Sequence, residues 1–221
     1  MKIISIFVKI SRLTKSNMKQ DIETKIIDAA RELFYEKGYM GTTVRDIANK
    51  ADVNLALLHY YFRTKDNIFK LVFEGALALL FGKLNKALTS NKTLFEKIEM
   101  MVASYITTGM QHPQLPSFVM TELAVNANLM LSLINSHKDK SVLSKNFERF
   151  YEEIEEAIEN KVIKRIEPNS ICTDIQALSL YPFIAKNCLL HSVFSDKKKY
   201  DKMMKERIEH VTNLIISNIK Q

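Results

Sequence analysis

Residues 38–69 read GYMGTTVRDIANKADVNLALLHYYFRTKDNIF, and this stretch decides the fold. Thr43 is a good helix N-cap, and Asp46, three residues later, can return the contact to form a capping box. Asn54 is a second N-cap candidate, directly before another run of apolar residues at helical spacing. Thr64 can cap a longer helix that follows. The stretch therefore predicts two short helices separated by a tight turn, with a longer helix after them. This arrangement suits a helix-turn-helix or an ordinary helical hairpin.

The residues before this stretch predict a supporting helix. Residues 18–37 carry apolar side chains at helical spacing, and Gly38 ends that helix because glycine adopts the left-handed conformation without strain. Residues 1–17 are expected to be a weakly ordered or mis-assigned extension, with a basic arm on DNA or an amphipathic surface anchor as alternatives. Six side chains are predicted to form the core of this region: Leu33, Phe34, Ile47, Ala48, Leu58 and Phe62.

The composition favours an all-α fold. Only 5 glycines and 4 prolines punctuate 221 residues, too few for the turns of a sandwich, a barrel or an alternating α/β fold. The apolar share of 47% is enough to build a core. The formal net charge is +7, and residues 1–70 hold 13 basic against 8 acidic side chains. The excess of positive charge near the N-terminus is typical of a region with a polyanionic partner, either nucleic acid or anionic lipid, and also of a merely soluble surface.

The cysteines and the hydropathy pattern predict a cytoplasmic protein. Cys172 and Cys188 lie in apolar helical pattern without a Cys-x-x-Cys spacing, so we expect no disulfide framework, no zinc site and no cofactor. The longest apolar stretch, residues 71–84, is interrupted by Glu74 and Lys83 and is not expected to span a membrane. We expect neither export nor stable membrane association.

Enzymatic function is not expected. The chain lacks a glycine-rich phosphate loop, a His-Glu-x-x-His motif, paired Glu-x-x-His units and a nucleophile elbow. The acidic run of residues 152–159 is interpreted as a solvated helix face. Two non-enzymatic classes remain: a DNA-binding regulator, and a helical protein at a membrane surface that uses residues 1–13 as its anchor. A lipid-flotation assay distinguishes them.

Several spaced segments resemble the tetracycline-repressor (TetR) family of bacterial transcriptional regulators. They are Gly38–Ala48, Ala51–Asn54 and Leu58–Phe69, and they match in the right order over about fifty residues. The sequence departs from the family pattern at Asp52, where glycine is usual, and at His59, where tyrosine is common.

The resemblance implies a helix-turn-helix DNA-binding domain over residues 18–66. It also implies a helical ligand-binding and dimerisation domain over residues 67–221. The protein is then expected to be a ligand-responsive regulator, usually a repressor, with an activator as the alternative.

The resemblance also implies the residues that meet DNA. Thr43, Tyr61 and Lys65 map onto contacts to the phosphate backbone, and Thr42 lies beside them. The third helix is expected in the major groove, where arginine forks to guanine, asparagine pairs with adenine and apolar groups meet thymine methyls. The candidates for base contacts are Arg45, Asn54, Leu55, Leu57, His59 and Tyr60.

The second domain carries no motif of its own. Residues 141–164 and 170–194 are expected to form a four-helix interface between two copies, which would bind a palindromic operator; the alternative is that they pack only within one copy. Further helices are expected over residues 94–110, 116–136 and 197–219. An unknown small-molecule effector is expected in an apolar cavity, although core packing explains the same side chains. The candidate effector contacts are Met101, Tyr105, Phe118, Glu122 and Asn126.

Overall fold

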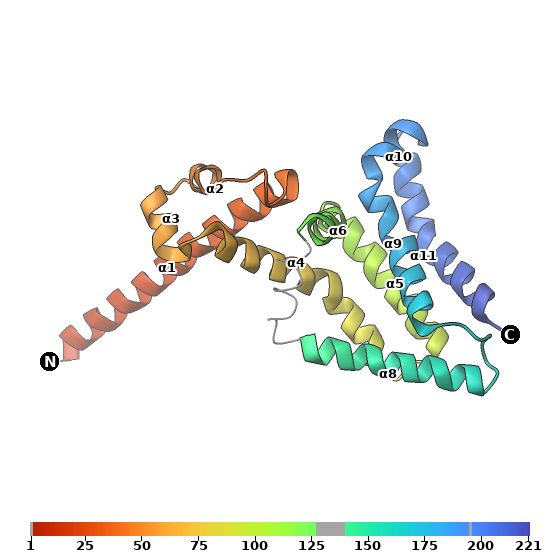
Figure 1. Cartoon of the computed structure of the whole chain (residues 1–221). Coiled ribbons are helices and arrows are strands. Elements are labelled where there is room, and N and C mark those ends of the chain that lie inside the picture. Colours follow the sequence, from red (N-terminus) through yellow and green to blue (C-terminus); the bar gives the residue numbers. More distant parts are fainter. Residues whose placement is uncertain (1, 127–139, 195) are drawn as a thin grey trace. The chain divides into compact units, whose positions relative to one another are not determined.

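The computed structural model describes residues 2–126, 140–194 and 196–221. Two compact units share these residues, one ending at Phe73 and the other running from Glu74 to Gln221. Regular structure in the described ranges is helical, apart from an isolated bridge between Ile163 and Lys220 (Figure 1). The all-α expectation is confirmed.

The first unit is built from α1 (Lys2–Lys37), α2 (Val44–Lys50), α3 (Leu55–Phe62) and the beginning of α4 (Lys65–Leu88). Figure 1 shows α1 as one uninterrupted helix. The structure therefore has helical backbone over residues 2–17, the stretch predicted to be a weakly ordered or mis-assigned extension, and that interpretation stays a prediction. No glycine or proline lies within α1, so nothing in the backbone interrupts its hydrogen-bond ladder.

The core of the first unit confirms the hydrophobic pattern. All six predicted core side chains are buried, with Phe34, Ile47 and Leu58 fully inaccessible. The start of α4 belongs to the same core, because the Phe69 ring lies 5.0 Å from that of Phe34 and 4.8 Å from that of Tyr39. The boundary between the units consequently falls after Phe73 instead of after residue 66.

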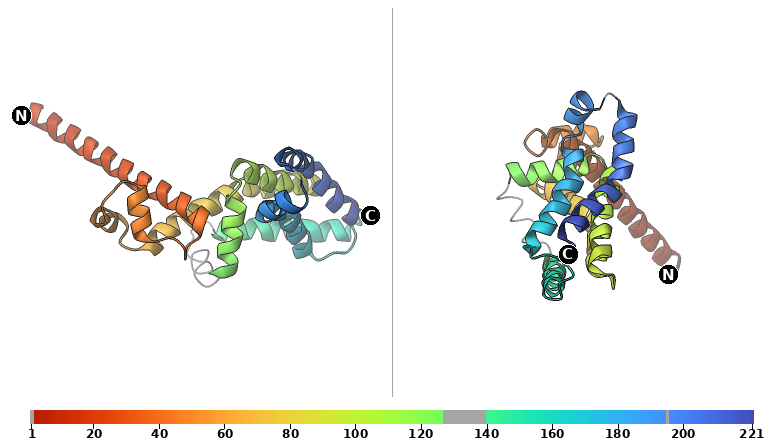
Figure 2. Two further views of the ribbon diagram at one scale, coloured as in Figure 1. Left: turned by 90° about the horizontal axis from the view of Figure 1, so that it is seen from above. Right: turned by 90° about the vertical axis from the view of Figure 1, so that its right-hand side faces the viewer.

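The second unit contains the rest of α4 and a bundle of six further described helices. Within it α5 packs against α8, α9 and α11, while α6 packs against α9, as the views in Figure 2 also show. The bounds are Leu94–Gln111 for α5, Leu115–Val125 for α6, Lys140–Glu159 for α8, Pro168–Ile184 for α9, Lys186–Ser192 for α10 and Lys197–Ile219 for α11.

The sequence predicted some of these helices better than others. The bounds of α11 match the prediction, and α5 exceeds its prediction by one residue. The helix expected over residues 116–136 ends at Val125, and residues 127–136 of that prediction lie outside the described residues. The helix expected over residues 170–194 is broken at Ala185 into α9 and α10.

Pro182 lies in the last turn of α9, three residues before the break at Ala185. Proline has no backbone N–H, so the carbonyl oxygen of Leu178, four residues earlier, loses its helical donor. The Arg207 guanidinium of α11 replaces that donor with two hydrogen bonds to the Leu178 oxygen, at 2.9 and 2.7 Å. The Tyr200 hydroxyl of α11 donates to the Pro182 oxygen at 2.9 Å. Helix α11 therefore supplies the hydrogen bonds that the end of α9 lacks.

Candidate nucleic-acid interface

The turn between α1 and α2 is tight for steric reasons. Gly38 has φ 69°, the left-handed conformation that the sequence predicted for it. A Cβ atom on Gly41 would lie only 2.4 Å from the Lys37 carbonyl oxygen, so no other residue fits there without movement. The Thr42 side chain is buried and its hydroxyl donates to the Gly38 oxygen at 2.9 Å. This burial removes the Thr42 side chain from the predicted DNA contacts.

Thr43 forms the predicted capping box at the start of α2. Its hydroxyl accepts from the Asp46 amide at 3.1 Å, and the Asp46 carboxylate accepts from the Thr43 amide at 2.9 Å. The Thr43 hydroxyl also donates to this carboxylate, and these hydrogen bonds lower the pKa of Asp46. The cap is thus present, while the contact between Thr43 and a phosphate remains a prediction. Arg45 is exposed on the same short helix.

The turn between α2 and α3 has a Schellman arrangement. The Asp52 amide donates to the Asn49 oxygen at 3.2 Å and the Val53 amide to the Ala48 oxygen at 3.0 Å. Asp52 has φ 54°, so aspartate stands in the left-handed conformation that glycine adopts most easily. The departure from the family pattern at this position therefore leaves the turn intact.

Helix α3 divides into an outer and an inner side. Asn54 caps it by accepting from the Leu57 amide at 2.7 Å. Leu58 and Phe62 are buried against the core of the first unit, which fixes the rotation of the helix. The exposed side chains form a surface that we call the α3 face, and Leu57 and Tyr61 flank it half-buried. The α3 face consists of Leu55, Ala56, His59 and Tyr60.

Three of the four residues of the α3 face were candidates for base contacts, and Ala56 was not. Its methyl group carries no chemical signal of binding, so only the helical period could have placed it on the outer side. The structure also groups Asn54 and Leu57 with the α3 face, at its beginning and its flank. Tyr60 is 77% exposed and is the most prominent side chain of the face.

Lys65 braces the first unit at the beginning of α4. Its ammonium group donates to the carbonyl oxygens of Tyr39 at 3.0 Å and Thr42 at 3.1 Å, and it lies 4.0 Å from the centre of the Tyr39 ring. The Tyr39 hydroxyl in turn donates to Asp66. These contacts tie the turn before α2 to α4. Lys65 therefore has a positioning role that the sequence did not predict, and its phosphate contact stays a prediction.

The link from α3 to α4 contains a strained residue. Arg63 has φ 64° and ψ −53°, and the Thr64 amide donates to the Phe62 oxygen at 2.7 Å, which defines a γ-turn centred on Arg63. His59 Nδ1 lies 2.9 Å from the Arg63 oxygen, and the Asn67 side-chain amide donates to the Phe62 oxygen at 2.9 Å. Side chains on both helices thus hold the turn.

The predicted effector residues lie in the second unit and are mostly buried. Met101 and Tyr105 come from α5, and Phe118 and Glu122 from α6. Asn126, at the end of α6, donates to the Glu122 carboxylate at 2.6 Å. Both helices pack against α9.

Buried hydroxyl groups are the polar feature of this interior that the sequence did not reveal. Those of Tyr105, Thr108, Ser179 and Thr212 have no hydrogen-bond partner among the described residues. Gln176 lies near enough to influence the Tyr105 hydroxyl, without the geometry of a hydrogen bond. Burial raises the pKa of Tyr105. Single serine and threonine residues on a helix follow no recognisable pattern, so only packing identifies them.

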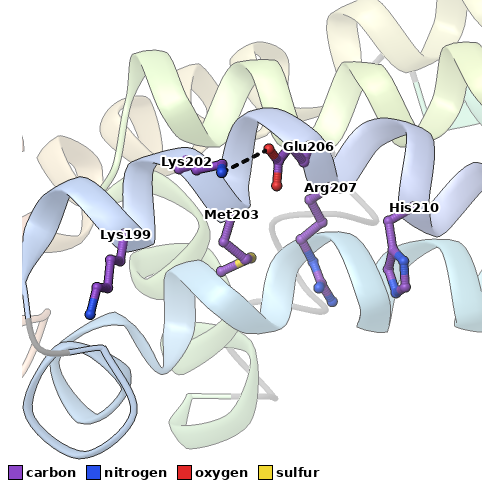
Figure 3. A pocket seen from close by; sticks show the side chains of 6 residues that line it. All are labelled: Lys199, Lys202, Met203, Glu206, Arg207 and His210. Atoms are coloured by element: carbon purple, nitrogen blue, oxygen red, sulfur yellow. Dashed lines mark ion pairs between the residues drawn. The ribbon is translucent and has the colours of Figure 1, made fainter.

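A hollow of about 490 Å³ lies elsewhere, along α11. Figure 3 shows the Arg207 side chain extending from α11 towards α9, where it meets the Leu178 oxygen. Lys202 and Glu206 form an ion pair at 3.8 Å beside it. None of the predicted effector residues lines this hollow. Its lining is mainly charged and consists of Lys199, Lys202, Met203, Glu206, Arg207 and His210.

The described part of the chain has neither a cluster of metal-ligating side chains nor a membrane-spanning helix. No three His, Cys, Asp or Glu side chains there are grouped to hold a metal ion. None of the helices in this part combines the length and the apolar character needed to cross a bilayer.

A family model described as "Bacterial regulatory proteins, tetR family" matches residues 26–72. This segment contains α2, α3 and the parts of α1 and α4 that pack against them. The match therefore coincides with the candidate interface.

Two curated relatives are transcriptional regulators. The probable HTH-type transcriptional regulator YttP of Bacillus subtilis (strain 168) is 31% identical over 127 residues, which cover 54% of this chain but less than two thirds, 59%, of YttP. The biofilm operon icaADBC HTH-type negative transcriptional regulator IcaR of Staphylococcus aureus (strain Newman) is 31% identical over 144 residues, covering 60% of this chain and 70% of IcaR.

A solved structure has a similar fold over most of this chain, across both of its units. The transcriptional regulator FadR from Bacillus subtilis, in complex with stearoyl-CoA, aligns with a TM-score of 0.60 over 89% of this chain and 98% of that chain. The two sequences are 19% identical, so this likeness concerns the fold.

Proposed function

Because the chain belongs to the tetR family of bacterial regulatory proteins, and is thus a transcriptional regulator, we propose that it represses transcription from a palindromic operator. In this proposal a cytoplasmic homodimer binds the operator, and a small-molecule effector bound to the second unit releases it. The observation that carries the proposal is the α3 face, an exposed helix side whose opposite side is anchored by Leu58 and Phe62.

The proposed DNA contacts follow from exposure and chemistry. The α3 face, with Asn54 and Leu57 beside it, meets base edges in the major groove, where leucine and alanine side chains suit thymine methyl groups. Arg45, exposed on α2, contacts a guanine. Thr43, Tyr61 and Lys65 lie around the face and contact phosphates, which position the helix without reading sequence.

We propose that two copies meet through α9 and α11. Tyr181 is 58% exposed on α9, with Ile184 a helical turn away, and Leu214 is 47% exposed on α11. Because α9 and α11 pack together, a second copy can cover these apolar side chains at once. The sequence placed one half of the interface on residues 141–164, but Phe150 and Ile154 of that stretch are buried within their own unit. A dimer is needed because one helix-turn-helix reads too few base pairs.

We propose that the effector enters the interior bounded by α5, α6 and α9. The buried hydroxyls of Tyr105, Thr108 and Ser179 support this, because a polar group of a ligand would supply the partners they lack. The surrounding side chains, such as Met101 and Phe118, suit an apolar ligand body. Stearoyl-CoA is the first probe, because the FadR structure was solved with it.

The decisive test is selection of genomic fragments by the purified chain, followed by affinity measurement on the enriched sequence. Enrichment of a palindrome supports the proposal, and failure to enrich any sequence contradicts it. Arg45→Ala should change the base preference, whereas Arg31→Ala, an exposed arginine on α1 paired with Asp28, should leave it unchanged. Addition of stearoyl-CoA should lower the affinity if this compound is an effector, since ligand and DNA then oppose each other.

Sedimentation tests the interface. Tyr181→Glu should convert the wild-type dimer to monomer and abolish tight operator binding. Burying an unpaired carboxylate in the interface costs more free energy than the apolar contacts provide. Val162→Glu, at a 46% exposed position after α8, is the matched control and should remain dimeric. A dimeric Tyr181→Glu variant would contradict the proposed surface.

Two alternative functions, an activator and a membrane-surface protein, can be tested separately. In vitro transcription from the selected promoter distinguishes a repressor from an activator by the sign of the effect. Flotation with lipid vesicles, comparing the full chain with one that begins at Met18, tests the membrane-surface alternative. Binding to vesicles that depends on residues 1–17 would favour that alternative.

A further inference from the structure

The hydrogen bond between His59 and Arg63 fixes the chemistry of the His59 ring. Nδ1 of His59 lies 2.9 Å from the Arg63 carbonyl oxygen. A carbonyl oxygen can only accept a hydrogen bond, so Nδ1 must carry the hydrogen. In the neutral imidazole the other ring nitrogen, Nε2, then has a lone pair and no hydrogen. His59 therefore presents an acceptor at the far edge of its ring.

The surrounding backbone holds this arrangement. The Arg63 amide donates back to the His59 carbonyl oxygen at 3.0 Å, so the two residues are joined by a reciprocal pair of hydrogen bonds. Arg63 is the central residue of the γ-turn, and Thr64 and Asn67 both donate to the Phe62 oxygen beside it. The position of the Arg63 oxygen is thus determined by α3 and α4 together, and it selects the tautomer of His59.

Because His59 lies on the exposed α3 face, its Nε2 acceptor is available to a donor on a DNA base. Its neighbours Leu55 and Ala56 have no hydrogen-bonding groups in their side chains, and all three residues are exposed. On the major-groove edges of the bases, the donors are the amino groups of adenine (N6) and cytosine (N4). Guanine and thymine present only acceptors there, which an acceptor cannot satisfy.

We infer that His59, through Nε2, accepts a hydrogen bond from the exocyclic amino group of an adenine or a cytosine in each operator half-site. This rests on the proposed function, in which α3 enters the major groove. Arg63 acts as the positioning residue, because its carbonyl oxygen fixes the tautomer and the ring orientation. His59 is then a residue of the α3 face that determines specificity by hydrogen bonding, beside Tyr60, whose exposed phenol also carries a hydrogen-bonding group. Leu55 and Ala56 contribute apolar contacts.

Two substitutions separate the two nitrogens of the ring. In His59→Asn the side-chain amide can still donate to the Arg63 oxygen, but nothing reaches the Nε2 position. In His59→Gln the longer side chain places an amide near the Nε2 position and gives up the contact with Arg63. The wild type and both variants are used to select sequences from a duplex library with two symmetric randomised half-sites. His112→Asn, at an exposed histidine after α5, is the matched control.

We expect His59→Asn to lose the preference at one base-pair position in each half-site, by about 3- to 10-fold, the value of one hydrogen bond. His59→Gln should keep part of that preference, and His112→Asn should keep all of it. A second duplex replaces the amino group of the selected adenine or cytosine with hydrogen. The wild type should bind it about 3- to 10-fold more weakly, whereas His59→Asn should bind both duplexes equally.

The inference is overturned if the wild type binds the two duplexes equally, or if neither substitution at His59 changes the base preference. In both cases the wild type still enriches a palindrome, so the proposed function stands. A wild type that enriches no sequence overturns the proposed function and this inference together. Thermal unfolding of each variant identifies those that have lost the fold of α3. If a variant is unfolded, the binding of the wild type to the duplex without the amino group tests the inference instead.

Discussion

Helices α3 and α9 both end at a backbone irregularity, and the comparison shows two ways to stabilise such an end. The γ-turn at Arg63 is held by His59 and Asn67, which lie four and five residues from the atoms they contact. The break after Pro182 is held by Tyr200 and Arg207, which lie 18 and 29 residues from their acceptors. The first end is stabilised locally and can form with its own unit. The second forms only when α9 and α11 pack.

This difference suits the roles that we propose for the two units. A helix that reads DNA must keep its orientation whatever happens in the rest of the protein, and local hydrogen bonds provide that. A bundle that responds to an effector can use contacts between helices, because any shift of α11 relative to α9 then changes their hydrogen bonds. The comparison predicts that substitutions at the end of α9 destabilise packing, while substitutions around Arg63 act on one turn.

The largest loss of stability is expected at an ion pair between two helices of the second unit. This ion pair, like the contacts at the end of α9, joins residues far apart in the chain. Lys97 of α5 is 5% exposed and its ammonium lies 2.6 Å from the carboxylate of Glu153 on α8. Glu153→Gln leaves a buried positive charge with weaker compensation and should lower the free energy of unfolding by about 3 kcal/mol. Lys97→Met should cost under about 1 kcal/mol, because it removes the charge and keeps the chain length. Urea unfolding at fixed protein concentration measures both.

Arg207→Leu should lower the free energy of unfolding by about 2 kcal/mol, because the Leu178 oxygen then loses both of its donors. Lys205→Leu, at an exposed position on the same helix, is the control and should stay within about 0.5 kcal/mol of the wild type. The same Arg207→Leu change in a Pro182→Ala background should cost less, because residue 182 then has an amide to offer. Equal costs in both backgrounds would refute the role of Arg207 as a replacement for the missing amide of Pro182.

Tyr200→Phe removes the hydrogen bond to the Pro182 oxygen and should cost about 1 kcal/mol at neutral pH. Burial raises the pKa of Tyr200 to about 12, above the ordinary value near 10. Between these two pH values the unfolded chain loses the phenol proton and the folded chain keeps it. Wild-type stability should therefore fall as the pH rises from 10 to 12. The phenylalanine variant should lose less stability over this range in pH-dependent thermal unfolding.

Arg63→Gly should raise the stability of the first unit by about 1 kcal/mol, because glycine relieves the cost of a positive φ. Met40 is exposed and does not have a positive φ, so Met40→Gly should leave the stability of the first unit unchanged or lower it. Because the reciprocal hydrogen bonds with His59 involve only the backbone of residue 63, the base preference should survive. Thermal unfolding monitored by signals from the first unit is the measurement.

The smallest effect is expected at Asp52, where glycine should add about 0.5 kcal/mol. Aspartate tolerates the left-handed conformation better than arginine does, so less strain is available for release. The Schellman hydrogen bonds of Asp52 and Val53 are made by the backbone and should persist. A larger gain at Asp52 than at Arg63 in the same unfolding assay would contradict this ranking of strain.

Local signals explain which elements could be predicted. The caps at Thr43 and Asn54 and the bounds of α11 depend on residues within one helical turn, and the structure has them as predicted. Where a prediction failed, the decisive partner was remote or the pattern was ambiguous. Thr42 is buried by packing of its turn. The helix expected over residues 170–194 is broken at Ala185, and residues of α11, distant in the chain, satisfy the carbonyl groups around Pro182.

By itself, the sequence determined the all-α class, the three helices around the turn and the family, because hydrophobic period, caps and spaced motif residues act over short distances along the chain. The tertiary structure alone decided that Lys65 braces the turn at Tyr39, that Phe150 and Ile154 of α8 are buried within their own unit, and that four buried hydroxyls have no hydrogen-bond partner among the described residues. It also decided which ring nitrogen of His59 faces outward. Each of these depends on groups brought together by packing, whose separation in the chain carries no periodic signal.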